Sequence, residues 1–223
     1  AREVRRSIPM QITMSNADEY LQRLVDFLPH HQASHNFEWI SPNQTERAHK
    51  FAVESALDAT DRATFQAMEA LIHNLNTMNS RAGAQVPFSS INYGTDTSPE
   101  ARMVMRNLLK ATEAGLGNGE TPIFPVQIFK VKEGVNYNPG DPNYDLFQQA
   151  MKTSAKRLFP NFSFLDAPFN LEYYKPGDYN SEVAYMGCRT RVMGNVHDPE
   201  KSVTCGRGNL SFTSINLPRL AIK

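Results

Sequence analysis

The sequence is short of cysteine, of net charge and of long apolar runs, and each shortage excludes a class of protein. Two cysteines in 223 residues cannot form the disulfide framework of a small secreted domain, so we expect a reducing, cytoplasmic environment. The 23 basic and 23 acidic side chains cancel, which argues against general electrostatic binding to nucleic acid or to an anionic membrane. No apolar run reaches the roughly 18 residues that a membrane-spanning helix needs.

Familiar catalytic and metal-binding motifs are also missing from the sequence. The glycines of GLGNGE at 115–120 follow an expected helix and precede an expected strand, which is the reverse of the order that points a helix N-terminus at phosphate. We therefore predict a helix end and a turn there. None of the six histidines pairs with a cysteine at metal-ligand spacing, so we predict no metal site. A G-x-S-x-G motif for a hydrolase nucleophile is absent as well.

What the sequence does contain is a helical first part followed by strands that alternate with helices. Apolar spacing predicts helices over 16–28 and from Ser41 to about Ser80. Beyond Gly83 the pattern changes, and we place a domain boundary near residue 85. Apolar strands alternating with helices predict an α/β fold with a largely parallel sheet, open or closed into a barrel. The expected strands lie within 86–94, 121–131, 161–170 and 206–220, and the expected helices within 98–115 and 138–159.

The second of the early helices carries a stripe of small side chains. Its alanines recur at steps of three or four, which places them on one helix face. Such a face allows another helix to approach closely, and the partner is either an element of the same chain or a second copy in a dimer. The stripe consists of Ala52, Ala56, Ala59, Ala63, Ala67 and Ala70.

One of the two cysteines, Cys188, lies in the segment EVAYMGCRTRVMGN at 182–195. Gly187 before it permits a tight backbone turn, and the positive charge of Arg189 and Arg191 favours a thiolate. The loop-like composition that follows predicts a presented side chain. A lone cysteine is also a common small buried residue, so these features by themselves leave a functional and a structural role open.

The segment YMGCRTRVMGN, with GRGNLSFTSINLPR after it, resembles the finger loop and the next barrel strand of the anaerobic (class III) ribonucleoside-triphosphate reductases. The resemblance runs almost unbroken from about Val86 to Lys223, and residues 1–85 fit the family's preceding helical region through less specific motifs. It implies about half of a ten-stranded α/β barrel over 86–223, with the finger loop around Cys188. Three further segments carry it: VPFSSINYGTDTSPEARM, ATEAGLGNGETPIFPVQIFKVKEGVNYNPGDPNYDLF and SAKRLFPNFSFLDAPFNLEYY.

The same resemblance implies roles for three residues. Cys188 takes the place of the cysteine that forms a thiyl radical and abstracts the 3′ hydrogen of a ribonucleotide. Asn209 matches the family asparagine that polarises the ribose hydroxyls, and an amide suits that role because it both donates and accepts hydrogen bonds. Met186 matches the methionine of members that use formate as reductant. The resemblance is too loose elsewhere to name residues that bind a cofactor or an effector.

The sequence departs from the family in what it lacks. The C-terminal glycyl-radical segment, the cysteine-rich zinc site beside it and the second active-site cysteine have no counterpart in these residues. Cys205 precedes the last expected strand, and we expect a local structural role for it. We therefore expect a portion of the catalytic core of a longer enzyme, inactive when isolated.

The resemblance also implies partners for the longer enzyme. They are ribonucleoside triphosphate substrates, nucleotide effectors including ATP, a radical S-adenosylmethionine/iron–sulfur activase that makes the glycyl radical, and a second copy in a homodimer. The product would supply deoxyribonucleotides for DNA replication. Two alternatives stay open: a nucleotide-binding or dimerisation module without turnover, which would use the helix at 45–80, and another glycyl-radical enzyme such as an acyltransferase or lyase. A paired Cys-Cys would favour the acyltransferase, whereas Gly187 and Arg189 flank Cys188.

Overall fold

The computed structural model describes residues 42–78, 85–187, 190–193, 198 and 214–222. The helix expected over 16–28 and the residues Cys188, Cys205 and Asn209 lie outside these ranges. The predictions that concern them are therefore not tested by the structure.

Three parallel strands form the central sheet, as the alternation of strands and helices predicted. They are β1 (Ser90–Tyr93), β2 (Val126–Val131) and β3 (Asn161–Phe164), in the order β1-β2-β3. Ser90 pairs with Val126, and Ile128 pairs with Asn161. The α/β class is thus confirmed, while closure into a ten-stranded barrel is a feature that three strands do not test.

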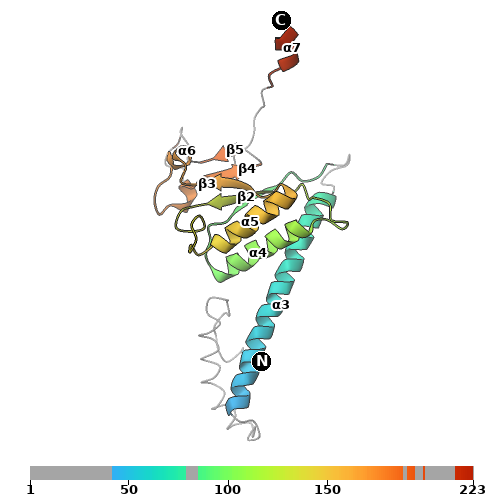
Figure 1. The fold of residues 1–223 in the computed structure, drawn as a ribbon, viewed down its shortest axis with the longest axis vertical. Coiled ribbons are helices and arrows are strands. Elements are labelled where there is room, and N and C mark those ends of the chain that lie inside the picture. The colour runs from blue at the N-terminus through green and yellow to red at the C-terminus, as the bar shows by residue number, and fades with distance from the viewer. Residues whose placement is uncertain (1–41, 79–84, 188–189, 194–197, 199–213, 223) are drawn as a thin grey trace.

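Two helices cover one face of this sheet, and a long third helix packs alongside one of them (Figure 1). The covering helices are α4 (Pro99–Ala114) and α5 (Tyr144–Arg157), and α3 (Pro42–Thr77) packs on α4. α3 ends within a few residues of its predicted limit. The domain boundary near residue 85 stays a prediction.

The ends of α4 follow the sequence signals closely. Ser98 caps its start, because the Ser98 Oγ accepts from the Ala101 N–H at 3.3 Å and Pro99 occupies the first turn. Gly115 ends it with φ of 83°, a backbone conformation that glycine adopts without steric cost. Arg157 of α5 then donates to the carbonyls of Glu113 and Ala114 at 2.9 and 3.0 Å. These contacts confirm that 115–120 is a helix end and a turn.

Side-chain alternation on β2 separates the two faces of the sheet. Phe129 and Val131 lie in the core beneath α4 and α5, with Leu109 and Leu146. Val126 and Ile128 point to the opposite face, where they pack with Tyr185. The face away from the helices is therefore the face that meets the segment around Cys188.

A short hairpin lies on that second face. Its strands are β4 (Ala184–Met186) and β5 (Thr190–Val192), which pair in antiparallel fashion. Two short helices precede it, α6 (Pro168–Leu171) and the 3-10 helix η2 (Tyr179–Ser181). Figure 1 shows the hairpin on the side of the sheet opposite α4 and α5.

The last predicted strand, within 206–220, is wrong over its described part. Residues 214–216 have no regular structure, and α7 (Leu217–Ile222) follows them. The physical reason is local: the Asn216 Oδ1 accepts from the Arg219 N–H at 3.0 Å, as an N-cap does. Pro218 fits the first helical turn and removes a donor that a strand would need.

The alanine stripe on α3 faces away from α4. All six of its alanines are exposed, whereas Phe65, Met68 and Ile72 form the face that packs with Leu108 of α4. No element of the described ranges covers the stripe, so the interpretation as packing within the chain finds no support there. The alternative, a dimer contact, stays a prediction.

Candidate functional site

The candidate site centres on the hairpin whose strands flank Cys188. Tyr185 pairs with Arg191 and Met186 with Thr190, so β4 ends immediately before the predicted turn. Gly187 has φ of 65°, in the left-handed region that glycine occupies without steric cost. A Cβ on Gly187 would also lie 3.2 Å from Cε1 of Phe88. Both observations agree with the sequence-based prediction of a glycine-dependent turn at this position.

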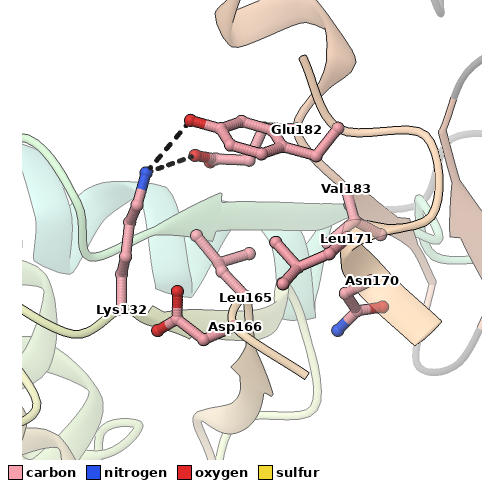
Figure 2. Close-up of a pocket in the computed structure, with 8 residues that line it drawn as sticks. Lys132, Leu165, Asp166, Asn170, Leu171, Glu182 and Val183 are labelled. Atoms are coloured by element: carbon pink, nitrogen blue, oxygen red, sulfur yellow. Dashed lines mark hydrogen bonds and ion pairs between the residues drawn. The ribbon is translucent and has the colours of Figure 1, made fainter. Parts of the chain in front are cut away.

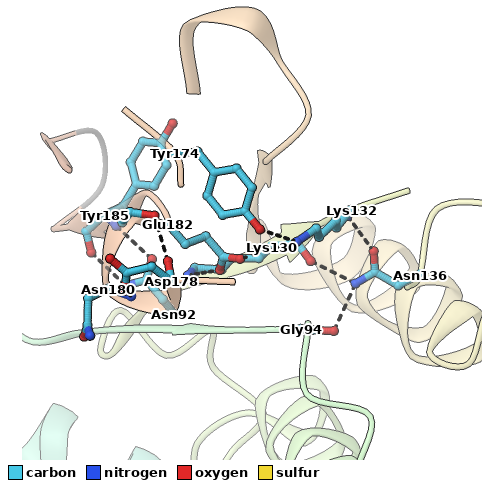
Figure 3. Close-up of polar contacts among 11 residues, drawn as sticks. Asn92, Gly94, Lys130, Lys132, Asn136, Tyr174, Asp178, Asn180, Glu182 and Tyr185 are labelled. Atoms are coloured by element: carbon cyan, nitrogen blue, oxygen red, sulfur yellow. Dashed lines mark hydrogen bonds and ion pairs between the residues drawn. The ribbon is translucent and has the colours of Figure 1, made fainter. Parts of the chain in front are cut away.

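Two polar side chains of β1 hold β4 against the sheet. The Asn92 Nδ2 donates to the Tyr185 carbonyl at 2.8 Å, and the Asn92 Oδ1 accepts from the Tyr185 N–H at 2.8 Å (Figure 3). The Ser90 Oγ accepts from the Gly187 N–H at 3.0 Å. The side chains of Asn92 and Ser90 therefore take the place of the backbone groups that a neighbouring strand in a sheet would offer to β4.

An ion pair ties the segment before β4 to β2. The Lys130 Nζ lies 2.7 Å from Oε1 of Glu182, and the two side chains are 14% and 10% exposed. Lys132 approaches the same carboxylate, with its Nζ 3.9 Å from Oε2, and donates to the Tyr174 hydroxyl at 3.4 Å (Figure 3). Because each charge is largely withdrawn from water, either one would be costly to leave without its partner.

A small pocket opens beside this ion pair. Its cavity volume is about 20 Å³, far below the roughly 300–1,000 Å³ typical of small-molecule sites. The pocket is therefore too small to be a nucleotide site by itself. Figure 2 shows its lining, which consists of Lys132, Leu165, Asp166, Asn170, Leu171, Tyr174, Glu182 and Val183.

Two buried asparagines hydrogen-bond to the backbone at the ends of β1 and β2, next to Lys130 and Lys132. The Asn136 Nδ2 donates to the carbonyls of Gly94 and Lys130 at 3.0 and 2.9 Å, and the Asn136 Oδ1 accepts from the Lys132 N–H at 2.9 Å. The Asn143 Nδ2 donates to the Gly94 carbonyl at 3.1 Å. Both asparagines are fully buried, and full pairing is what makes such burial tolerable.

Another buried polar chain lies on the helix side of the sheet. The Tyr93 hydroxyl donates to the Gln127 Oε1 at 2.8 Å, and the Gln127 Nε2 donates to the Thr112 Oγ1 at 2.8 Å. Burial raises the pKa of Tyr93, so this hydroxyl remains a proton donor in any ordinary buffer. It faces away from the hairpin and serves the packing of α4.

Comparison with known proteins places these features in a family. The model of the anaerobic ribonucleoside-triphosphate reductases matches residues 12–223. The chain belongs to this reductase family. Since the match begins at residue 12, most of the helical region also lies within it, which confirms the looser resemblance over residues 12–85.

Several curated reductases of this family are similar to the chain over most of its length. The anaerobic ribonucleoside-triphosphate reductase of Haemophilus influenzae is 32% identical over 212 residues, which is 95% of this chain and 28% of the relative. The Escherichia coli reductase is 30% identical over the same shares. The reductase of Enterobacteria phage T4 is 35% identical over 182 residues, or 79% of this chain and 29% of the relative. The chain thus spans less than a third of the length of these reductases.

Of the three residues that the sequence nominated for the reductase site, only Met186 is described. It is the last residue of β4, half-buried, and paired with Thr190. Cys188 and Asn209 lie outside the described ranges, so the three proposed roles stay predictions. Within the ranges that the structure describes, no three acidic, histidine or cysteine side chains form a potential metal site. None of the described helices has the length and apolar character to cross a membrane.

Sequence reasoning missed the polar groups that hold the hairpin: Ser90, Asn92, Lys130 and Glu182. A signal for two of them was present, because Ser90 and Asn92 stand at alternate positions of the strand SINY. Polar residues with a period of two mark one face of a strand. The sequence did not reveal that this face meets a segment more than 90 residues away.

Proposed function

We propose that this chain is a portion of the catalytic core of an oxygen-sensitive glycyl-radical reductase. The complete enzyme converts ribonucleoside triphosphates to deoxyribonucleoside triphosphates, and Cys188 carries the thiyl radical. The observation that carries the proposal is the hairpin β4–β5, with Gly187 at the start of its turn and β4 anchored on the polar face of a parallel sheet.

The chemistry that we assign to Cys188 depends on sulfur. A thiyl radical abstracts the 3′ hydrogen of the ribose, so an S–H bond forms while the C3′–H bond breaks and the radical moves to C3′. Asn209 polarises the ribose hydroxyls through its amide, which donates and accepts. Formate is the proposed reductant, and Met186 lies on β4 beside Gly187.

The proposed partners follow from the family. They are ribonucleoside triphosphates, nucleotide effectors, a radical S-adenosylmethionine activase that generates the glycyl radical, and a second copy in a homodimer; we propose a cytoplasmic setting. The family likeness also underlies our proposal that β1, β2 and β3, which pair in parallel, belong to a ten-stranded barrel of the complete enzyme. Because the glycyl-radical segment has no counterpart in these 223 residues, we propose that the chain alone does not turn over.

The exposed alanine face of α3 favours a second candidate function, a dimerisation or nucleotide-binding module without turnover. The two candidates differ in what they require of Cys188. A reductase needs its sulfur, whereas a module of the second kind does not.

Replacement of each cysteine in the complete reductase tests the proposed function. Cys188→Ser should abolish deoxynucleotide formation, since the O–H bond of serine is too strong to yield the radical, while nucleotide binding and the glycyl-radical electron paramagnetic resonance signal persist. Cys205→Ser is the matched control and should keep turnover. A Cys188→Ser enzyme that still reduces ribonucleotides, or a Cys205→Ser enzyme that alone is inactive, would refute the assignment.

A further inference from the structure

The contact between β1 and β4 is made by side chains on one strand and backbone on the other. The two strands belong to different sheets, yet the amide of Asn92 pairs with both the N–H and the C=O of Tyr185, each at 2.8 Å (Figure 3). Because an asparagine amide carries a donor and an acceptor side by side, it replaces the pair of backbone groups that a neighbouring strand would offer.

In the second contact a side chain of β1 again bonds the backbone of β4, two residues away on each strand. Ser90, two before Asn92, accepts from Gly187, two after Tyr185. Residues two apart lie on one face of a strand, so both contacts come from the same face of β1. β4 therefore runs antiparallel to β1 with a single register. Successive backbone groups of a strand point to opposite edges, so a shift by one residue would turn the N–H and C=O groups of β4 away from Asn92.

These two contacts end at the residue that precedes Cys188. The Gly187 N–H is bound to Ser90, and the Gly187 Cα lies so close to Phe88 that a Cβ would meet its ring at 3.2 Å. The peptide that leads into Cys188 is thus held in position by a hydrogen bond and by a close packing contact.

We propose that Ser90 and Asn92 are positioning residues for the radical chemistry, because they set the register of β4 on β1 and hence the place of the Cys188 sulfur relative to the ribose. This rests on the proposed function of Cys188. Hydrogen transfer requires the reacting atoms within about 3–3.5 Å of each other, and a displacement of about 1 Å can cost about 100-fold in rate. Ser90 and Asn92 act through the backbone of β4 and need not touch the substrate.

The test compares variants of the complete reductase that the proposed function requires. Ser90→Ala removes the acceptor for Gly187, whereas Ser90→Thr retains it. Asn92→Ala removes both bonds to Tyr185, and Asn92→Asp retains the acceptor alone. The matched control is Asn76→Ala, because the Asn76 amide makes the same two-way contact with the backbone of Phe124, at 2.6 and 3.0 Å. It is a stringent control: the hydrogen bonds of Asn76 go to Ile72, Ile123 and Phe124 and not to β4, while the Phe124 ring lies in the same apolar cluster as Tyr185.

We expect Ser90→Ala and Asn92→Ala to lower kcat about 10- to 100-fold with KM for the ribonucleotide unchanged. Ser90→Thr should restore kcat to within about threefold of the parent, and Asn92→Asp should fall between Asn92→Ala and the parent enzyme. Asn76→Ala should keep full kcat although it loses a comparable pair of hydrogen bonds to the backbone. Amide hydrogen exchange should accelerate at Tyr185 and Gly187 in the Asn92→Ala and Ser90→Ala enzymes and stay unchanged there in Asn76→Ala.

Two results would overturn the proposal. One is full kcat in Ser90→Ala and Asn92→Ala, with or without faster exchange at Tyr185 and Gly187. The other is an equal loss of kcat in Asn76→Ala, which would show that the loss of any such pair of side-chain hydrogen bonds to the backbone has the same effect. If Asn92→Ala does not fold, the comparison of Ser90→Ala with Ser90→Thr decides alone. Failure of the proposed function is seen separately, as turnover by Cys188→Ser.

Discussion

A nearly isosteric substitution of the buried Asn136 should have a large effect on stability. Asn136→Asp keeps the shape of the side chain, yet it replaces the amide donor with an oxygen. That donor serves the carbonyls of Gly94 and Lys130, at 3.0 and 2.9 Å, in a site with no solvent exposure. The remaining oxygen still accepts from the Lys132 N–H, so two of three hydrogen bonds are affected and no cavity forms.

The size of the effect depends on pH. At neutral pH the introduced carboxyl either stays charged against two carbonyl oxygens or takes up a proton, so its pKa in the folded state rises above the usual value near 4. We expect the free energy of unfolding to fall by about 3–6 kcal/mol at pH 7, combining the lost hydrogen bonds with the cost of neutralisation. At pH 4 the neutral acid donates one O–H again, and the loss shrinks to about 1–3 kcal/mol.

The direction of this pH dependence follows from the linkage between proton binding and folding. Because the folded state favours the protonated form, it binds more protons than the unfolded state, and the variant loses stability as pH rises above the ordinary carboxyl pKa. Urea unfolding followed by circular dichroism at both pH values measures this, with each variant compared to the parent at the same pH. Asn74→Asp, the same change on an exposed position of α3, is the control and should shift stability by less than about 0.5 kcal/mol. An equal loss for Asn136→Asp at both pH values, or a loss below about 1 kcal/mol at pH 7, would refute the reasoning.

Three further predictions concern the backbone and the exposed helix face. Gly94→Ala should destabilise by about 2–4 kcal/mol in urea unfolding, because its Cβ would lie 2.6 Å from the Lys130 carbonyl oxygen at φ of 129°; an unchanged midpoint would contradict this. Leu158→Gly should raise the free energy of unfolding by about 0.5–1 kcal/mol, since Leu158 has φ of 66° and is 78% exposed, whereas Leu158→Ala should bring no gain. Ala63→Leu on the exposed stripe should weaken a dimer by about 1–3 kcal/mol through overpacking, and sedimentation that finds a monomer for the parent would exclude that contact.

The elements whose ends depend on near neighbours could be predicted from the sequence. Ser98, Pro99 and Gly115 determine where α4 begins and ends, because each acts on backbone groups within four residues of itself. The failure at the C-terminus has the same local origin: Asn216 and Pro218 are helix-start signals, and the apolar residues around them outweighed these signals in the sequence analysis.

The sequence also indicated a presented turn at Gly187 and the family to which its segment belongs. It did not indicate what holds that turn. Asn92 and Tyr185 are 93 positions apart, and Ser90 and Gly187 are 97 apart, so no local pattern links them. The alanine stripe on α3 is a similar case, since spacing identified the face and only packing decided that the opposite face meets α4.

The sequence by itself determined the α/β class, the limits of α3 and α4 and the position of the turn before Cys188. The tertiary structure decided which polar side chains anchor β4, which carboxylate pairs with Lys130 and which buried asparagines support the strand ends. The physical reason is the range of the interactions. The backbone groups at helix ends and turns are satisfied by groups close along the chain. The acceptor of a buried donor such as the Asn92 amide comes within reach only once the strands have paired and packed.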